Sequence, residues 1–463
     1  MRLFCTARGE VVPFEPGPIV KMYTCGITPY DAAHLGHAEV YVTYDVLQRR
    51  LRDLGHRTQC VRNITDVDDD ILRKSRELGV HYLDLAAGEI ARFDHDMRAL
   101  SVLPVHSTPR ATSAIPDILG FIGMVLDAGH AYRAGGAVYF DVSTFERFGQ
   151  VSHLDREHML ALAAERGGNP DDPFKDDPLD FVLWQPSADG EPAWDSLWGK
   201  GRPGWHIECS ALALRELGTT IDLHGGGTDL IFPHHECETA QSEAATGEPF
   251  VKHWMHIGMV RLGGEKMSKS LGNLVTIKEA LAQFNSDALR LFVLTSHYRS
   301  PLSYSDEGVA GAERGVARLR AAVTPRPGED TSGEPDELAE ARRVAIERFT
   351  AAMDDDFNTA SGLAQLFELA KEINRSRESG TSGSGVAEAQ RTLLKLAGVL
   401  GLTLEESERD LGAKPFVDLL LEVRQELRGA KQYALADRIR KELEQLGIAV
   451  EDRAGGTSWR MAR

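Results

Sequence analysis

Strand-like and helix-like segments alternate in two separate parts of this 463-residue chain, and this alternation constrains the fold more than any other feature. The expected elements are Ile19–Cys25, Ala38–Leu54 and Arg57–Asn63 in the first part, and Trp205–Leu217, Ile221–His224, Pro233–Ala245 and His253–Val260 in the second. Strands and helices that alternate with short joints are typical of a parallel α/β sheet. We therefore predict one Rossmann-like domain whose two halves lie apart in the sequence.

The other segments predict appended modules, because a chain of this length is too long for one ordinary core. A stretch rich in Pro, Gly and Asp, with a hairpin pattern at Tyr132–Val142, reads as an insertion between the two halves. After Ser270 amphipathic helical patterns dominate, and a helix, a strand and a hairpin end the chain. The predicted order is the first half of the sheet domain at 1–102, an insertion at 103–201, the second half at 202–270, a connecting region at 271–325, an α-helical bundle at 326–411 and a small α+β domain at 412–463.

The composition excludes several classes of protein. Five scattered cysteines argue against a disulfide framework and for free thiols or metal ligands in a reducing compartment. No apolar run of about 18 residues exists, and the amino terminus lacks a signal-peptide pattern, so we expect a cytoplasmic protein that does not enter a membrane. The net charge of −18 argues against a polyanionic partner, although residues 412–463 hold 10 basic and 8 acidic side chains.

A first candidate site joins the first strand to the first long helix, in the segment Cys25-Gly-Ile-Thr-Pro-Tyr-Asp-Ala-Ala-His34-Leu-Gly36-His37. Two imidazoles flank a glycine where the N–H groups of a helix face outward, an arrangement that suits a polyphosphate. Neutral histidines can donate hydrogen bonds to phosphate oxygens. Capping of the loop is an equally open explanation of these residues alone.

A second candidate site is the segment Gly263-Gly-Glu-Lys266-Met-Ser-Lys269-Ser-Leu-Gly-Asn273. Two lysines three residues apart on a glycine-flanked loop can move onto a leaving pyrophosphate, whereas a solvated basic loop is the simpler explanation. The order of the two segments is more specific: together they resemble the HIGH and KMSKS signatures of the class I aminoacyl-tRNA synthetases. The resemblance implies that His34, His37, Lys266 and Lys269 are catalytic, and that ATP is bound with Mg²⁺.

Residues with metal-binding side chains are found in both halves of the predicted sheet domain. Cys25 ends a strand, Cys209 lies in a predicted helix, and His234 and Glu238 are four residues apart on the next one. Two thiols, an imidazole and a carboxylate suit Zn²⁺ in type and number, although a satisfied polar core fits the spacing at least as well.

The segments around these residues closely resemble the cysteinyl-tRNA synthetase family. In that family this set of residues binds one zinc ion per chain, and the zinc receives the thiolate of L-cysteine. A direct metal–thiolate bond discriminates against serine, which an ordinary pocket rejects only about 10²-fold. Such an enzyme needs no editing domain, in agreement with an insertion of only about 100 residues.

The resemblance also assigns supporting roles. Gly36, Gly226 and Asp229 are expected to join His34, His37 and Lys269 in binding ATP. The expected pocket for the amino acid contains Thr28, Thr65, Trp205 and His224, with a core aromatic as the alternative for Trp205. Near Thr65 the acidic run Asp66–Asp70 favours helix capping and pocket lining over a Mg²⁺ site.

The tail resembles the anticodon-binding end of the same family, and Asp287-Ala-Leu-Arg290 resembles the segment that leads from the catalytic loop to the tRNA-facing stem. An exposed Trp can stack on an unpaired base, and Arg or Asp can read its edges. The predicted anticodon residues are Asp437, Arg440, Asp452 and Trp459, the alternative for Trp459 being the core of a small subdomain. The resemblance implies tRNA(Cys) as the partner, and a monomer.

Two departures from the family pattern bear on this reading. Ile27 and Pro29 replace the usual Pro and Val, a variant that also resembles the ligase that joins cysteine to an amino sugar in mycothiol synthesis. Cys237 takes a position usually held by a polar amide, where it could compete for metal or be oxidised. A sugar ligase has no use for an anticodon module, and a non-catalytic tRNA-binding paralogue would be expected to lack the signature histidines or lysines. The prediction is therefore an enzyme that forms cysteinyl-adenylate and transfers cysteine to tRNA.

Overall fold

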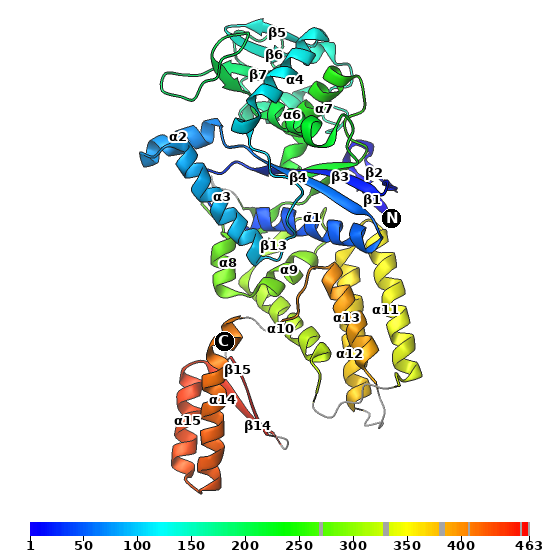
Figure 1. Ribbon diagram of the computed structural model, residues 1–463, viewed down its shortest axis with the longest axis vertical. Helices are drawn as coiled ribbons and strands as arrows, with labels where there is room; N and C mark the ends of the chain where they lie inside the picture. The colour runs from blue at the N-terminus through cyan, green and yellow to red at the C-terminus, as the bar shows by residue number, and fades with distance from the viewer. Residues whose placement is uncertain (268–271, 327–332, 379–384, 406–407, 454–455, 462–463) are drawn as a thin grey trace. The chain divides into compact units, whose positions relative to one another are not determined.

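Four parallel strands form the sheet on which the candidate sites are built (Figure 1). They are β3 (Ile19–Ile27), β4 (Arg57–Ile64), β9 (Leu223–Gly227) and β10 (Trp254–Ile257), in the order β10-β9-β3-β4. The chain runs outward from β3 to β4 and, in the second half, outward from β9 to β10. The carboxyl ends of β3 and β9 therefore bound the crevice where doubly wound sheets bind ligands.

The structure is a computed structural model that describes residues 1–267, 272–326, 333–378, 385–405, 408–453 and 456–461. It divides into two compact units, residues 1–404 and residues 405–463. Among the described residues, no helix is long and apolar enough to cross a bilayer.

Helices cover both faces of the sheet. On one face lies α1 (Leu35–Asp53), which buries Val42, Val46 and Leu51 at helical spacing. On the other lie α6 (Trp205–Leu217) and α7 (Glu236–Thr246) (Figure 1). Strand β3 approaches β4 so closely at Gly26 that a Cβ atom there would lie 1.5 Å from the Asn63 carbonyl oxygen, which explains why the residue after Cys25 is glycine.

The insertion carries its own four-stranded antiparallel sheet, in the order β5-β6-β7-β8. Its elements are α4 (Ile115–Asp127), β5 (Ala131–Ala134), β6 (Ala137–Phe140), α5 (Arg156–Glu165), β7 (Phe181–Pro186) and β8 (Gly201–Pro203). Before it come the hairpin β1 (Arg2–Cys5) and β2 (Glu10–Pro13), and the helices α2 (Asp69–Leu78) and α3 (Tyr82–Ala99).

A helical region follows the sheet domain within the first unit. It contains β11 (Val260–Leu262), β12 (Glu265–Lys266), α8 (Ile277–Gln283), α9 (Ser286–Leu294), β13 (Leu302–Tyr304), α10 (Asp306–Val323), α11 (Asp336–Asp354), α12 (Thr359–Glu378) and α13 (Ala387–Val399). A buried ion pair ties this region to α1, because Arg290 donates to Asp45 at 2.5 Å and to the carbonyl oxygens of Leu100 and Leu400. The same α9 carries Asp287, which accepts from the backbone N–H groups of Thr403 and Leu404.

The second unit is small. Helices α14 (Glu408–Gly429) and α15 (Tyr433–Gln445) precede the antiparallel strands β14 (Ile448–Arg453) and β15 (Gly456–Met461). Val417, Leu421, Leu443, Ile448 and Val450 form its apolar core. The predicted helix, strand and final hairpin are all present.

The predicted fold class, a parallel α/β sheet interrupted by an insertion and followed by helices, is confirmed, and three predicted elements are wrong in their limits. Strand β9 begins and ends later than the predicted Ile221–His224. Helix α7 begins at Glu236 and not at Pro233, because the residues before it, Ile231–His235, form a π-helical turn. Within that turn Phe232 has an extended backbone (φ −135°, ψ 136°), as expected of a residue before proline. The single strand expected at His253–Val260 is two strands. Between them, Gly258 lies where a Cβ atom would approach the Ser300 carbonyl oxygen to 2.4 Å.

Candidate functional site

A cavity of about 380 Å³ opens at the carboxyl ends of β3 and β9. Its walls include five of the six residues predicted to bind ATP, namely His34, Gly36, His37, Gly226 and Asp229. Cys25 and Thr28 line the same cavity. Two sequence segments almost 200 residues apart therefore meet in one pocket, in the place that the topology of the sheet favours for a ligand.

The two histidines of the first segment also cap α1. The backbone N–H of Gly36 donates to His34 Nδ1 at 3.1 Å, and the N–H of His34 donates to His37 Nδ1 at 3.2 Å. Because Nδ1 accepts in both rings, the neutral tautomer carries its proton on Nε2. Capping and ligand binding are thus compatible functions of the same side chains.

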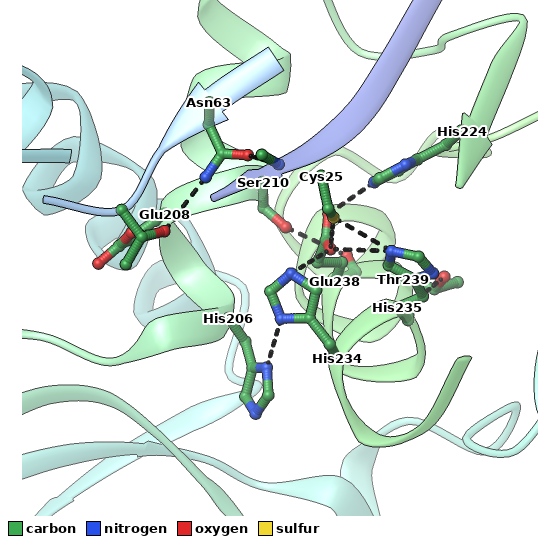
Figure 2. A network of polar contacts seen from close by, with 12 residues as sticks. Cys25, Asn63, His206, Glu208, Ser210, His224, His234, His235, Glu238 and Thr239 are labelled. Carbon is green, nitrogen blue, oxygen red and sulfur yellow. Dashed lines mark hydrogen bonds and ion pairs between the residues drawn. The ribbon is translucent and has the colours of Figure 1, made fainter. Parts of the chain in front are cut away.

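A group of buried donor atoms lies beside this cavity. Single ligand atoms of Cys25, His234, His235 and Glu238 all lie within 4.8 Å of one another. Cys25 Sγ is 3.2 Å from His235 Nε2, and His234 Nε2 is 2.9 Å from Glu238 Oε1 (Figure 2). Three of the four predicted metal ligands are in this group, and His235 is an additional member.

Cys209, the fourth predicted ligand, borders the group from α6. Its thiol hydrogen-bonds with Cys25 and with His234. The hydrogen bond from Cys25 lowers the pKa of Cys209 to about 6, against the opposing effect of burial. Burial raises the pKa of Cys25 well above its usual range. One thiol of this pair is therefore poised to be a thiolate while the other keeps its proton.

Histidines surround the donor group. His224 Nε2 lies 2.9 Å from Glu238 Oε2, and His206 Nδ1 lies 2.9 Å from His234 Nδ1 (Figure 2). His256 Nε2 lies 2.6 Å from His235 Nδ1. Burial lowers the pKa of His206 and His256 to about 3, so both are neutral at pH 7. The rings of His206 and His256 therefore fix the orientation of His234 and His235 without adding charge.

The donor group fits a divalent cation. Burial opposes the charge on Glu238, but His224 and His234 outweigh it and hold the pKa of that carboxyl at about 2. A thiolate at Cys209 and a carboxylate at Glu238 are both fully enclosed, and such charges are stable only when they are paired. Burial opposes the charge on His234, but Glu238 and Cys209 outweigh it and raise the pKa of His234 to about 10, so an imidazolium or a bound cation can balance the two negative groups. The donor group offers one sulfur atom, two imidazole nitrogens and a carboxylate oxygen, and Cys209 beside it offers a second sulfur atom; all are donor types that Zn²⁺ accepts.

The residues predicted to form the amino-acid pocket have different surroundings. Thr28 lines the cavity, and the ring of Trp205 stacks on His234 with centroids 4.2 Å apart. Thr65 donates to Glu208 at 2.9 Å on a buried surface between β4 and α6, and His224 is fully buried against Glu238. Trp205 and His224 therefore contact the donor group and not the described walls of the cavity.

The acidic run after Thr65 is used in hydrogen bonds and capping. Asp66 accepts from the backbone N–H and the hydroxyl of Thr112, and Asp68 caps α2 through the N–H of Asp70. Asp69 pairs with the buried Arg202. These contacts are those of a structural segment, as the composition of the run favours.

The basic loop lies largely beyond what the structure describes. Lys266 belongs to β12, which pairs with β11, and nothing is described of its side chain. Lys269 lies outside the described residues. Met267, between them, is buried and lines the cavity, so the described start of this loop reaches the site.

In the second unit, Asp437 and Arg440 are exposed on α15. The Trp459 indole N–H donates to Asp418 at 2.8 Å, and its ring packs on the core of the unit. Asp452 belongs to β14, and its side chain lies outside the described part. A contact of these residues with bases stays a prediction, and Trp459 also has a structural contact.

Sequence reasoning missed His235 and His206 as neighbours of the donor group. The signal for His235 was its position next to His234. In the regular helix that was expected from Pro233, however, the side chain of His235 would point away from the face that carries His234 and Glu238. Cys237, which raised the question of competition for metal, packs in the apolar core formed with α4 and α6, and burial raises the pKa of its thiol well above its usual range.

Comparisons with known proteins agree over the whole chain. Residues 11–314 match the family of tRNA synthetases class I (C) catalytic domains, residues 348–405 match the DALR domain, and residues 412–460 match the cysteinyl-tRNA ligase anticodon binding domain.

Curated relatives and solved structures were also found. The chain is 47% identical to the cysteine–tRNA ligase of Dehalococcoides mccartyi, over all of this chain and 99% of the relative. It is 45% identical to that of Pseudomonas aeruginosa, over 96% of both. The fold is similar to that of Mycobacterium tuberculosis methionyl-tRNA synthetase in complex with methionyl-adenylate, with a TM-score of 0.62, 17% identity, and coverage of 82% of this chain and 89% of the other.

Proposed function

The chain belongs to the cysteine–tRNA ligase family of class I aminoacyl-tRNA synthetases, and from this premise we propose how its residues divide the work. The observation that carries the proposal is the position of Cys25. This residue lines the cavity of the signature histidines and belongs to the buried donor group. A cysteine substrate whose side chain is held at the donor group would place its α-carboxylate within the same cavity as the ATP phosphates.

In the ATP half of the site, His34 and His37 donate from Nε2 to phosphate oxygens while their Nδ1 atoms stay engaged in the cap of α1. Gly226 lets backbone approach the nucleotide, and Asp229 accepts from a ribose hydroxyl or from the α-amino group of the substrate. Lys266 and Lys269 hold the leaving pyrophosphate, with Mg²⁺ on the ATP. The carboxylate of cysteine attacks the α-phosphate in line, so positioning and electrostatic stabilisation account for most of the acceleration.

In the amino-acid half, Cys25, Cys209, His234 and Glu238 would hold one zinc ion. Bound there, zinc supplies a soft Lewis acid that favours a thiolate over a neutral hydroxyl. Trp205 stacks on His234 and His224 hydrogen-bonds Glu238, so both act on the orientation of ligands. Thr28 faces the cavity and contacts the substrate directly.

For the second step, we propose tRNA(Cys) as the acceptor, with a terminal ribose hydroxyl that attacks the adenylate carbonyl. Asp437, Arg440, Asp452 and Trp459 are the candidate anticodon contacts. The match of residues 412–460 to an anticodon binding domain favours tRNA over an amino sugar as the acceptor. We further propose that the enzyme acts as a cytoplasmic monomer.

Cysteine-dependent ATP–pyrophosphate exchange, with zinc quantified on the same sample, tests this proposal. We expect exchange with cysteine and not with serine, and about one zinc per chain. Cys209→Ser is expected to lower the zinc content and to relax the discrimination against serine. Cys60→Ser is the matched control, because Cys60 is equally buried but outside the donor group. Full zinc occupancy in Cys209→Ser would remove Cys209 from the site.

A further inference from the structure

The segment Asp229–Glu238 carries parts of both halves of the site. Asp229 lines the cavity, and His234 and Glu238 belong to the donor group nine residues or fewer away. The first seven residues of this segment, up to His235, lie in a short 3-10 turn and a π-helical turn that is interrupted at Phe232, before α7 begins. Regular hydrogen bonding within a helix therefore does not by itself fix the position of Asp229 relative to the two ligands.

One contact with the insertion is made by Arg166, which follows α5. Its guanidinium Nη1 donates to the carbonyl oxygens of both Asp229 and Phe232. A single cation thus joins the two ends of the turn that leads from the cavity to the donor group. Arginine suits this position because its planar, always charged group donates several hydrogen bonds at once.

A second contact is apolar. The ring of Phe232 is 2% exposed and belongs to a small core with Val142, Met159, Ala163 and Leu179, all from the insertion. The residue between the two sites is therefore packed into the insertion and not into the sheet domain.

A third contact is made by Glu236, which lies between His234 and Glu238 and is fully buried. Its carboxylate accepts from the backbone N–H groups of Gly149 at 2.8 Å, Val151 at 3.1 Å and Ser152 at 2.8 Å. Charge-assisted hydrogen bonds of this kind are about twice as strong as neutral ones. The first turn of α7, which holds Glu238 and directly follows the segment with His234, is thereby anchored to one loop of the insertion.

We propose that Arg166 and Glu236 are positioning residues with separate effects: Arg166 sets the ATP side of the segment through Asp229, and Glu236 sets the metal side through the first turn of α7. Through these two residues the insertion fixes the position of the ATP site relative to the metal site. This inference rests on the proposed ATP and zinc sites. Neither side chain touches a reacting atom, so each acts through the residue that it holds.

Four variants test the separation, measured on the full-length, zinc-loaded enzyme. Arg166→Met removes both hydrogen bonds to the turn, and we expect the KM for ATP in pyrophosphate exchange to rise about 10-fold while the KM for cysteine stays within about twofold. Glu236→Gln replaces one acceptor oxygen by a donor that faces N–H groups. We expect zinc to be released to a chelator about 10- to 100-fold faster, with the KM for ATP almost unchanged.

Arg166→Lys and Glu236→Asp keep the charge. We expect the KM for ATP of Arg166→Lys to lie between those of the wild type and Arg166→Met, and the rate of zinc release from Glu236→Asp to lie between those of the wild type and Glu236→Gln. Glu236→Asp also keeps the test decisive if Glu236→Gln does not fold.

Two control variants break other links of the same elements. Glu243→Gln removes a carboxylate of α7 that pairs with Arg147 of the insertion but lies more than one helical turn beyond Glu238. Arg156→Met removes an arginine of α5 that pairs with Asp177 inside the insertion. Both controls are expected to release zinc and bind ATP as the wild type does.

Different results refute different claims. If the wild type bound no zinc and gave no exchange, the proposed function would fail and this inference with it. If the wild type behaved as proposed while Arg166→Met and Glu236→Gln matched the controls, only the positioning role of Arg166 and Glu236 would be refuted. Parallel losses of both KM values and zinc in both variants would also overturn the inference, because they would indicate a general loss of structure.

Discussion

Gly36→Ala is expected to impair catalysis without destabilising the protein. A Cβ atom at position 36 would lie 2.9 Å from His34 Cε1 and 3.0 Å from His34 Nδ1, whereas ordinary contacts begin near 3.4 Å. The imidazole must therefore recede by 0.5 Å, the difference between 3.4 and 2.9. The hydrogen bond from the Gly36 N–H to His34 Nδ1, now 3.1 Å, would lengthen to about 3.6 Å, which is beyond a hydrogen bond.

Two effects on stability oppose each other in this variant. Loss of the cap costs about 1 kcal/mol, and alanine in place of glycine within the first turn gains up to about 1 kcal/mol. The free energy of unfolding is therefore expected to stay within about 1 kcal/mol of the wild type. The rate of pyrophosphate exchange is expected to fall about 10- to 100-fold, because His34 no longer points Nε2 at the phosphates.

The measurement pairs exchange kinetics with urea unfolding, and Gly120→Ala is the matched control. Gly120 lies within α4, where an added Cβ meets nothing within 4 Å, so this variant is expected to gain stability by up to about 1 kcal/mol and to keep its activity. An exchange rate for Gly36→Ala within about twofold of the wild type would refute the role given to the His34 ring.

Three further predictions concern stability and the tail. Arg290→Met removes one of the two arginine partners of the buried Asp45 and leaves Arg49 as the other, and thermal or urea unfolding is expected to show a loss of about 3 kcal/mol; a loss below about 1 kcal/mol would contradict the burial of this pair. Burial raises the pKa of Glu39 to about 8, so the folded state holds its proton more tightly than the unfolded state and loses stability as pH rises from about 4.5 to 8. Glu39→Gln is then expected to be more stable than the wild type by on the order of 5 kcal/mol at pH 9 and equal to it at pH 4, and a constant difference would argue against this titration. Trp459→Phe loses the hydrogen bond to Asp418, and calorimetry is expected to show a loss of about 1 kcal/mol of stability in the second unit. If the indole ring also stacks on a base, the loss of binding free energy for tRNA(Cys) is expected to exceed this loss of stability.

The sheet domain was predictable because each half contains complete local signals. Apolar residues of α1 recur at helical spacing, β3 is a short and mostly apolar run that begins after Gly17-Pro18, and β4 follows the glycine at the end of α1. The meeting of the two histidines with Gly226 and Asp229 follows from topology, since parallel strands place their carboxyl ends at one edge.

The donor group was predictable only in part. Cys25, His234 and Glu238 lie together as the family resemblance implies, but the entry of His235 depends on the irregular turn before α7. The proline at position 233 predicts the extended backbone of Phe232, but it does not predict the course of the chain between Pro233 and α7. Contacts of Arg166 and Glu236 depend on how the insertion packs on α7, which neither periodicity nor spacing reports.

The measurement that tests the central claim most directly is cysteine against serine discrimination in pyrophosphate exchange, before and after removal and return of zinc. We expect a strong preference for cysteine in the zinc-loaded enzyme, loss of cysteine-dependent exchange when zinc is removed, and recovery of both when about one zinc per chain is restored. Undiminished exchange and discrimination in zinc-free protein would contradict the claim that the buried donor group selects the substrate through a bound metal.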